Sequence, residues 1–228
     1  MIEINNLSCH YRKKEVISNL DININEGKLI GIIGINGSGK TTLLKTIMNL
    51  INYEGVIKVD GEVLDIKTRA RLISYMPQFR IIPDLSVLMM VNAGRYPLNK
   101  GSLEAEKCLE YLELLGIKEL AFHNVKNISG GERQKAYLAM CLAQETKYIL
   151  LDEPSTYLDI DAKIELWEIL KKIVLLDKTI IIVSHEVLDV IEHCDEVMVI
   201  DKGKALYYGN NALPIIKEIF HIIRGEVK

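Results

Sequence analysis

Gly34-Ile35-Asn36-Gly37-Ser38-Gly39-Lys40-Thr41 is the stretch that decides the fold of this 228-residue chain. The apolar residues 28–33 before it predict a buried strand, and residues 42–50 after it predict a helix. A glycine-rich loop between a strand and a helix lets successive backbone N–H groups turn toward phosphate oxygens, and the helix adds its positive end. The spacing therefore predicts a loop that binds the phosphates of a nucleoside triphosphate.

Two side chains of this loop have predicted roles of their own. Lys40 is expected to reach the β- and γ-phosphates, and the Thr41 hydroxyl is expected to ligate Mg²⁺. The alternative, a glycine-rich turn without a ligand, fits poorly with a strand directly before it and a helix directly after it. The residues expected to contact the nucleotide are Gly34, Asn36, Gly37, Ser38, Gly39, Lys40, Thr41 and Thr42.

Other segments extend this motif into a fold. Residues 148–151 and 179–183 are apolar runs, and the helical segment between them is expected to begin at Asp161. This order indicates parallel strands that are covered on both faces. Residues 21–25 alternate in polarity, and residues 55–63 predict a strand, a turn and a second strand, so an antiparallel β layer is expected near the N-terminus.

Helical signals dominate the middle of the chain, where Ser102 is expected to cap a helix that Gly116 ends. We therefore predict an α/β fold in one domain, residues 1–228. Residues 1–79 and 147–228 are expected to form a phosphate-loop NTPase core with a parallel sheet and an antiparallel β layer. Residues 80–146 are expected to form a helical lobe inserted into that core.

Two acids directly follow the apolar strand at residues 148–151. Asp152 is expected to hold Mg²⁺ through its water ligands, and Glu153 is expected to polarise or deprotonate the attacking water. Both would lie at the edge of the sheet where parallel strands end, beside the phosphate loop. The alternative is a plain pair of surface acids, which such a strand in a phosphate-loop chain disfavours.

Polar residues follow two more predicted strands, and an aromatic residue precedes the phosphate loop. His185 comes after the strand at residues 179–183 and is a candidate donor to the γ-phosphate, although a lone histidine is more often structural. Gln78 is a candidate for contacting Mg²⁺ or the attacking water, where the alternative is a surface glutamine. Tyr11 is a candidate for stacking on the base, where the alternative is an ordinary half-buried tyrosine.

Composition narrows the class of protein. The chain has 28 basic and 31 acidic residues, and this balance argues against binding to nucleic acid or directly to anionic lipid. Four scattered cysteines without metal-site spacing indicate reduced, packed thiols in the cytosol. The sequence contains no signal peptide and no apolar run long enough to span a bilayer. If the protein acts at a membrane, another chain is expected to bring it there.

Taken in order, these residues resemble one family closely, the ATP-binding cassette (ABC) ATPases. Tyr11 matches the adenine-stacking position, residues 34–41 the Walker A motif, and Gln78 the Q-loop. Residues 151–154 match the Walker B motif with its glutamate, residues 155–159 the D-loop, and His185 the switch histidine. Residues 128–132, Ile-Ser-Gly-Gly-Glu, resemble the family signature, which usually begins with Leu and ends with Gln. Glu186 stands where Asp is more usual, and little effect is expected from it.

The resemblance implies a RecA-like core and a mechanism that needs two copies of the chain. Two ATP molecules, each with Mg²⁺, would be sandwiched in a head-to-tail homodimer. Ser129, Gly130 and Gly131 of one copy would face the γ-phosphate held by Lys40 of the other. Asp159 would link the two sites across the interface. ATP would close the dimer, and hydrolysis at Glu153 would open it.

A second resemblance suggests which kind of cassette this is. Residues 94–97, Gly-Arg-Tyr-Pro, are similar to importer ATPases for iron-siderophores, haem and cobalamin, although general cassette similarity could also account for them. Residues 78–97 would then contact an integral membrane permease. The chain would lie peripherally on the cytoplasmic side of the cell membrane and serve a substrate-binding protein indirectly. The expected cargo is an iron-siderophore or a related metal chelate.

Two other classes of ABC protein stay open at this point. A non-transport ABC ATPase of DNA repair or translation usually has a long coiled-coil insertion or tandem cassettes, and neither is present in this sequence. An exporter ATPase, or a regulatory ATP-binding partner with little turnover, is the other alternative. The full set of catalytic motifs argues against the regulatory partner, and only residues 94–97 separate import from export.

Overall fold

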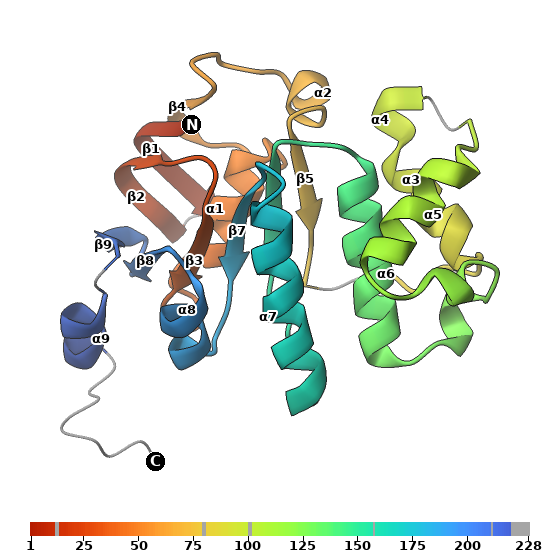
Figure 1. The fold of residues 1–228 in the computed structure, drawn as a ribbon. Coiled ribbons are helices and arrows are strands. Elements are labelled where there is room, and N and C mark those ends of the chain that lie inside the picture. The colour runs from red at the N-terminus through yellow and green to blue at the C-terminus, as the bar shows by residue number, and fades with distance from the viewer. Residues whose placement is uncertain (12–13, 79–80, 100–101, 157, 211, 220–228) are drawn as a thin grey trace.

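A six-stranded sheet forms the centre of the computed structural model, which describes residues 1–11, 14–78, 81–99, 102–156, 158–210 and 212–219 (Figure 1). The strand order is β5-β6-β7-β3-β8-β9. The first five strands are parallel, and β9 pairs antiparallel with β8. The strands are β3 (Leu29–Ile33), β5 (Ile73–Met76), β6 (Tyr148–Asp152), β7 (Thr179–Val183), β8 (Glu196–Asp201) and β9 (Lys204–Gly209).

The central strands are apolar along most of their length because both faces of the sheet are covered. Every residue of β3, β6 and β7 is buried. Alternate side chains point to opposite faces, so Ile30 and Ile32 belong to one buried cluster, and Leu29 and Ile33 belong to the other. The apolar runs of the sequence therefore mark the strands that lie between two cores.

One face of the sheet is covered by helix α1 (Lys40–Ile47) and a separate three-stranded antiparallel layer. The layer has the order β2-β1-β4, with β1 (Ile2–Tyr11), β2 (Lys14–Ile24) and β4 (Glu54–Val59). The prediction of a second strand at residues 62–63 is wrong. Asp60 and Gly61 form a turn with positive φ angles of 53° and 85°, and Glu62 makes only an isolated bridge to Val59.

Helices follow one another between β5 and β6, on the right in Figure 1. They are α3 (Val87–Gly94), α4 (Tyr96–Asn99), α5 (Ala105–Leu114) and α6 (Gly130–Ala143), with short 3₁₀ turns at Lys118–Leu120 and Val125–Asn127. Ser102 does not cap α5, because Glu104 is the residue at the N-cap position, and its backbone N–H donates to Asn92 Oδ1 at 3.0 Å. Gly116 follows this helix with a φ of 67°, as expected for a helix end.

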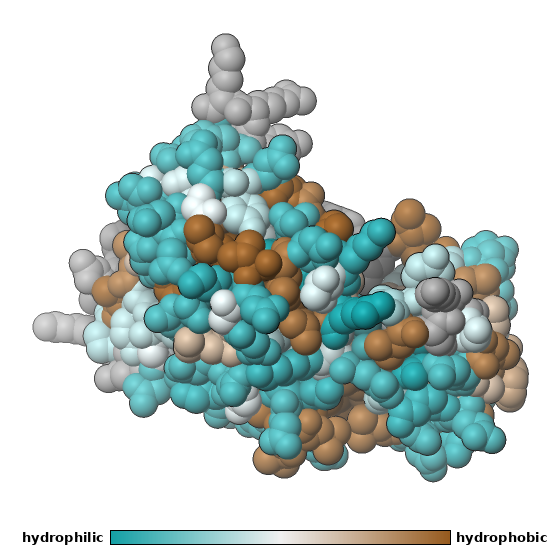
Figure 2. Space-filling view, turned by 90° about the horizontal axis from the view of Figure 1, so that it is seen from above, coloured by the Kyte–Doolittle hydropathy of each residue, from teal (hydrophilic) through white to brown (hydrophobic). Residues whose placement is uncertain are grey.

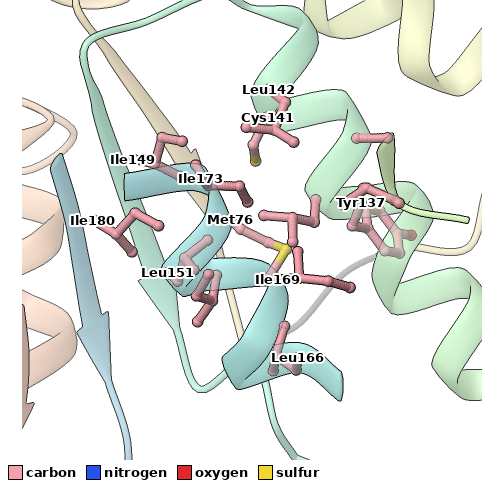
Figure 3. Packing of buried hydrophobic residues seen from close by; sticks show 14 of the residues in the cluster. Met76, Tyr137, Cys141, Leu142, Ile149, Leu151, Leu166, Ile169, Ile173 and Ile180 are labelled. Atoms are coloured by element: carbon pink, nitrogen blue, oxygen red, sulfur yellow. The ribbon is translucent and has the colours of Figure 1, made fainter. Parts of the chain in front are cut away.

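Helices α6, α7 (Ile160–Val174) and α8 (Val187–His193) cover the other face of the sheet. Figure 3 shows side chains of α6 and α7 meeting those of β5, β6 and β7 in one cluster. Asp159 caps α7 by accepting a hydrogen bond from Ala162 N at 2.9 Å, so the helix begins at Ile160, one residue before the predicted start at Asp161. The two remaining helices are α2 (Ile66–Arg69) and α9 (Leu213–Ile219).

The outer surface is mixed in polarity. On the face seen from above in Figure 2, hydrophilic side chains predominate and apolar side chains occur in separate groups. Within the described part of the chain, every helix falls short of the length and apolar character that a bilayer crossing requires.

Candidate functional site

The loop between β3 and α1 wraps around the side chain of Lys40. Its Nζ donates to the carbonyl oxygens of Gly34 at 2.8 Å and Ile35 at 3.1 Å. Gly37 and Gly39 have φ angles of 77° and 110°, which side chains with a Cβ rarely adopt. Burial lowers the pKa of Lys40, and the carboxylates of Glu153 and Asp152 partly offset this effect. A cation held in a loop of inward-turned backbone is suited to binding an anion such as a phosphate.

A hollow of about 360 Å³ opens on this loop. The chain segments that form its wall are far apart in sequence, and they meet where the parallel strands end. The hollow is lined by Val16, Asn36, Gly37, Ser38, Gly39, Lys40, Thr41, Thr42, Gln78, Glu153 and His185. Gly34 is the first residue of the loop. An added Cβ there would lie 2.1 Å from the Ile200 carbonyl oxygen.

Glu153 has a partner on each oxygen of its carboxylate. Gln78 Nε2 donates to Oε2 at 2.6 Å, and His185 Nε2 contacts Oε1. The residue is 7% exposed and has a φ of 52°, a conformation that costs about 1–3 kcal/mol outside glycine. Such strain persists only where the surroundings enforce it, and here it directs the carboxylate into the hollow between Gln78 and His185.

Asp152 and Thr41 form a candidate position for a divalent cation. Thr41 Oγ1 donates to Asp152 Oδ1 at 3.0 Å, and Tyr75 OH donates to Asp152 Oδ2 at 3.3 Å. Burial raises the pKa of Asp152 and thereby disfavours its ionised form. A cation beside the carboxylate would act in the opposite direction and favour the ionised form. Burial and the Asp152 charge raise the pKa of Tyr75, which keeps its phenol protonated and able to donate.

Mg²⁺ fits this pair of oxygens. It prefers oxygen ligands and commonly uses one or two protein groups together with substrate phosphates and water. Among the residues that the structure describes, no cluster of three His, Cys, Asp or Glu side chains could hold a metal on its own. A cation at Thr41 and Asp152 would therefore depend on the phosphates of a nucleotide for its remaining ligands.

Ser129, Gly130, Gly131 and Asp159 lie at a different place. They line a second hollow of about 340 Å³ between the N-terminal ends of α6 and α7, and it shares no lining residue with the first. Ser129 caps α6 by accepting from Glu132 N at 3.3 Å, and Glu132 Oε2 accepts from Ser129 N at 2.8 Å. These hydrogen bonds lower the pKa of Glu132 and make a complete capping box.

Tyr11 is the one predicted site residue whose side chain lies outside the described part of the structure, although its backbone ends β1.

A profile of the family described as "ABC transporter" matches residues 17–156, which is more than half of the chain. The chain belongs to the ABC transporter family. Members of this family bind and hydrolyse ATP, so the protein is an ATP-binding ABC ATPase. The structure agrees with this family in fold, since its sheet and helices match those of a solved ABC cassette at a TM-score of 0.82.

Three curated ABC relatives cover nearly the whole chain. The petrobactin import ATP-binding protein FpuC of Bacillus anthracis is 32% identical, covering 99% of this chain and 87% of that protein. The ferric enterobactin transport ATP-binding protein FepC of Escherichia coli is 34% identical, covering 96% and 85%. The glutamine transport ATP-binding protein GlnQ of Escherichia coli is 35% identical, covering 92% and 91%.

The solved structure is the dimeric MJ0796, a bacterial ABC transporter cassette. It is 27% identical and covers 92% of this chain and 99% of that chain.

Two residues at the phosphate-loop hollow and the candidate cation position were not predicted from the sequence. Val16 lines the hollow from β2, and Tyr75 reaches Asp152 from β5. Tyr75 lies three residues before Gln78, so the same strand that ends near Gln78 also carries it. The pleat of β5 sets the face of the sheet to which Tyr75 points. The contact of Tyr75 with Asp152 could have been predicted only if the pairing of β5 with β6 had been known.

Proposed function

We propose that this protein hydrolyses ATP at the interface of a head-to-tail homodimer and thereby drives uptake through a separate membrane permease. The cargo that we propose is an iron-siderophore or a related metal chelate. The chain would bind peripherally to the permease on the cytoplasmic side of the cell membrane and would serve a substrate-binding protein indirectly. The observation that carries the proposal is the position of Glu153, held by Gln78 and His185 at the rim of the phosphate-loop hollow.

The geometry supports a division of roles within one hollow. Lys40 and the loop N–H groups would bind the β- and γ-phosphates. Thr41 and Asp152, with Gln78 nearby, would hold Mg²⁺, which neutralises phosphate charge when bound. Glu153 would accept a proton from the attacking water while its carboxylate stays oriented by Gln78. His185 would donate toward the γ-phosphate from the opposite side.

The position of Ser129 and Gly131 supports a dimer. Ser129 caps α6 and Gly131 lies in its first turn, at the helix end where a phosphate is favoured, yet both residues line a different hollow from Lys40 in the same chain. A second copy turned head to tail would place each α6 N-terminus over the other copy's phosphates. Asp159 lies in that second hollow and would contribute to the same interface. The solved cassette MJ0796 is dimeric, which supports the formation of a dimer.

The cargo is inferred from relatives and from residues 94–97. FpuC and FepC act with petrobactin and ferric enterobactin, whereas GlnQ acts with glutamine. The Gly-Arg-Tyr-Pro step at residues 94–97 favours the chelate importers over the amino-acid system. All three relatives serve transport, which favours this class over a DNA-repair or translation ATPase.

Glu153→Gln tests this function. The variant should bind ATP as the parent does and lose hydrolysis by about 10²–10⁴-fold, because it lacks the general base. With ATP and Mg²⁺ it should sediment as a dimer, and the added change Ser129→Arg should return it to a monomer. In membranes the parent and the variant should both co-purify with a permease. Cells with the parent should take up a radiolabelled ferric chelate, and cells with Glu153→Gln should not.

Glu119→Gln is the matched control, since Glu119 is exposed in the 3₁₀ turn at Lys118–Leu120 and lies outside both hollows. Near-normal turnover in Glu153→Gln would contradict the role of Glu153. A monomer in ATP would contradict the dimer. Uptake of glutamine in place of the chelate would contradict the cargo.

A further inference from the structure

Tyr75 lies beside the candidate cation position although no motif in the sequence marks it. It belongs to β5, the edge strand of the large sheet, and its Cα is paired with that of Leu150 in β6. Paired residues of neighbouring strands share a face of the sheet, and so do residues two apart on one strand. Tyr75 and Asp152 therefore point to the same side, which is the side that α1 covers with Thr41 in its first turn.

Both oxygens of Asp152 are held by neighbouring hydroxyl groups. Thr41 Oγ1 donates to Oδ1 at 3.0 Å, and Tyr75 OH donates to Oδ2 at 3.3 Å. Asp152 is 1% exposed, so bulk water has little access to either oxygen. Rotation of the carboxylate would break one of these hydrogen bonds without a ready replacement.

The geometry points to Tyr75 as a positioning residue that holds Asp152 with Oδ1 turned toward Thr41 and so sets the affinity for the divalent cation that accompanies ATP. This inference rests on the proposed function and deepens it. Tyr75 donates to Oδ2, so Oδ1, which accepts from Thr41 and has a further acceptor site, is the oxygen that faces the cation or its waters. It acts through Asp152 and does not itself contact the nucleotide.

The expected size of the effect comes from residues of other proteins that hydrogen-bond to a metal ligand without touching the metal. A side chain that orients a ligand through a hydrogen bond typically changes metal affinity by about 10–100-fold when it is removed. Tyr75→Phe removes only the hydroxyl, and the ring that packs against the buried cluster remains. The fold should therefore persist while the Asp152 carboxylate gains freedom to rotate.

The experiment measures cation binding separately from turnover. ATP affinity is titrated by fluorescence in EDTA and at increasing Mg²⁺, and Mn²⁺ binding to the protein with ATP is followed by electron paramagnetic resonance. Tyr75→Phe should match the parent in EDTA. Its half-saturating Mg²⁺ and its Mn²⁺ dissociation constant should rise about 10–100-fold, and saturating Mg²⁺ should restore hydrolysis.

Tyr111→Phe is the matched control, because it removes a hydroxyl that donates to Glu145 at 2.9 Å among the helices between β5 and β6. An unchanged Mg²⁺ and Mn²⁺ dependence in Tyr75→Phe would overturn the inference. So would a loss of thermal stability with no change in cation dependence, since that is the result of a purely structural role. If the parent itself bound ATP without regard to Mg²⁺, the proposed function would fail instead.

Discussion

At the scale of single residues, a buried arginine shows how the phosphate-loop helix is held at its far end. Arg69 is 0% exposed, and its guanidinium donates to Ile47 O at 2.7 Å, Leu64 O at 3.2 Å and Thr46 O at 3.3 Å. Thr46 and Ile47 form the last turn of α1, where carbonyl groups lack partners within the helix. A cation is favoured at this negative end of the helix dipole.

Arg69→Met should lower the free energy of unfolding by about 3 kcal/mol, because it removes three charge-assisted hydrogen bonds to buried carbonyl groups, of which, among the described residues, Thr46 O alone keeps another donor, the backbone N–H of Asn49. The measurement is the midpoint and slope of urea unfolding. Arg71→Met, an exposed arginine two residues on, is the control and should change the stability by less than about 0.5 kcal/mol. Equal effects of the two changes would contradict a capping role for Arg69.

At the scale of elements, residues 94–95 have a structural explanation in the packing of α3 on α6. An added Cβ on Gly94 would lie 2.0 Å from the Met140 carbonyl oxygen, so only glycine permits this approach of the two helices. Arg95 is 6% exposed, pairs with Glu104 and Glu145, and donates to Ala143 O at 3.0 Å. Gly94 and Arg95 therefore hold α3 against α6. This structural role does not depend on any contact that the surface around them makes with a partner.

Gly94→Ala should lower the free energy of unfolding by about 1–3 kcal/mol, since the new methyl group would force α3 and α6 apart. Chemical denaturation followed by circular dichroism measures this loss. The control is Gly131→Ala in α6, where the added Cβ meets only the Ala162 Cβ at 3.7 Å. Gly131→Ala should leave stability unchanged or slightly higher, because alanine favours a helix. A stability of Gly94→Ala equal to that of the parent would rule out the close approach as a constraint.

At the scale of the whole molecule, a charged network joins the antiparallel layer to the large sheet. Asp60, which follows β4, accepts hydrogen bonds from the Met1 amino group at 2.7 Å, Tyr148 OH at 2.6 Å and Lys147 Nζ at 3.0 Å. Tyr148 is the first residue of β6 and lies in the core of the large sheet. Burial alone would raise the pKa of Asp60, but these donors outweigh it and hold the pKa at about 2.

The network should make stability depend on pH in the acid range. Because the folded pKa of Asp60 lies below the unfolded value of 3.8, its contribution is complete above about pH 4 and is lost as the pH falls toward about 2. Since the carboxylate is partly exposed and screened by solvent, we expect a loss of about 1 kcal/mol. Thermal melts from pH 5 to about pH 2 should show this slope for the parent and a smaller one for Asp60→Asn. The control is Asp161→Asn, at the exposed start of α7, which should keep the parent's slope of stability against pH. The same slope in Asp60→Asn as in the parent would contradict the network.

Much of the fold was predictable because the signals are local. The apolar runs at residues 28–33, 148–151 and 179–183 contain or match β3, β6 and β7 to within one residue, and residues 21–24 of the alternating stretch 21–25 fall in β2. Helix starts were less predictable, because several residues near each start can accept the first hydrogen bonds. Tertiary contacts also act at these positions: the backbone N–H of Glu104, the N-cap residue of α5, donates to Asn92 of α3, although Ser102 is the better cap by residue type.

The phosphate loop, the strands that surround it and the residue types at the strand ends could be read from the chain alone, because each depends on neighbours a few positions away. Which of those side chains meet became known only from the folded chain. Folding brings Gln78 and His185 onto Glu153, places Tyr75 on Asp152, and puts Ser129 in a different hollow from Lys40. Such contacts depend on strand order, on the pleat of paired strands and on helix packing, which residue patterns along the chain do not specify.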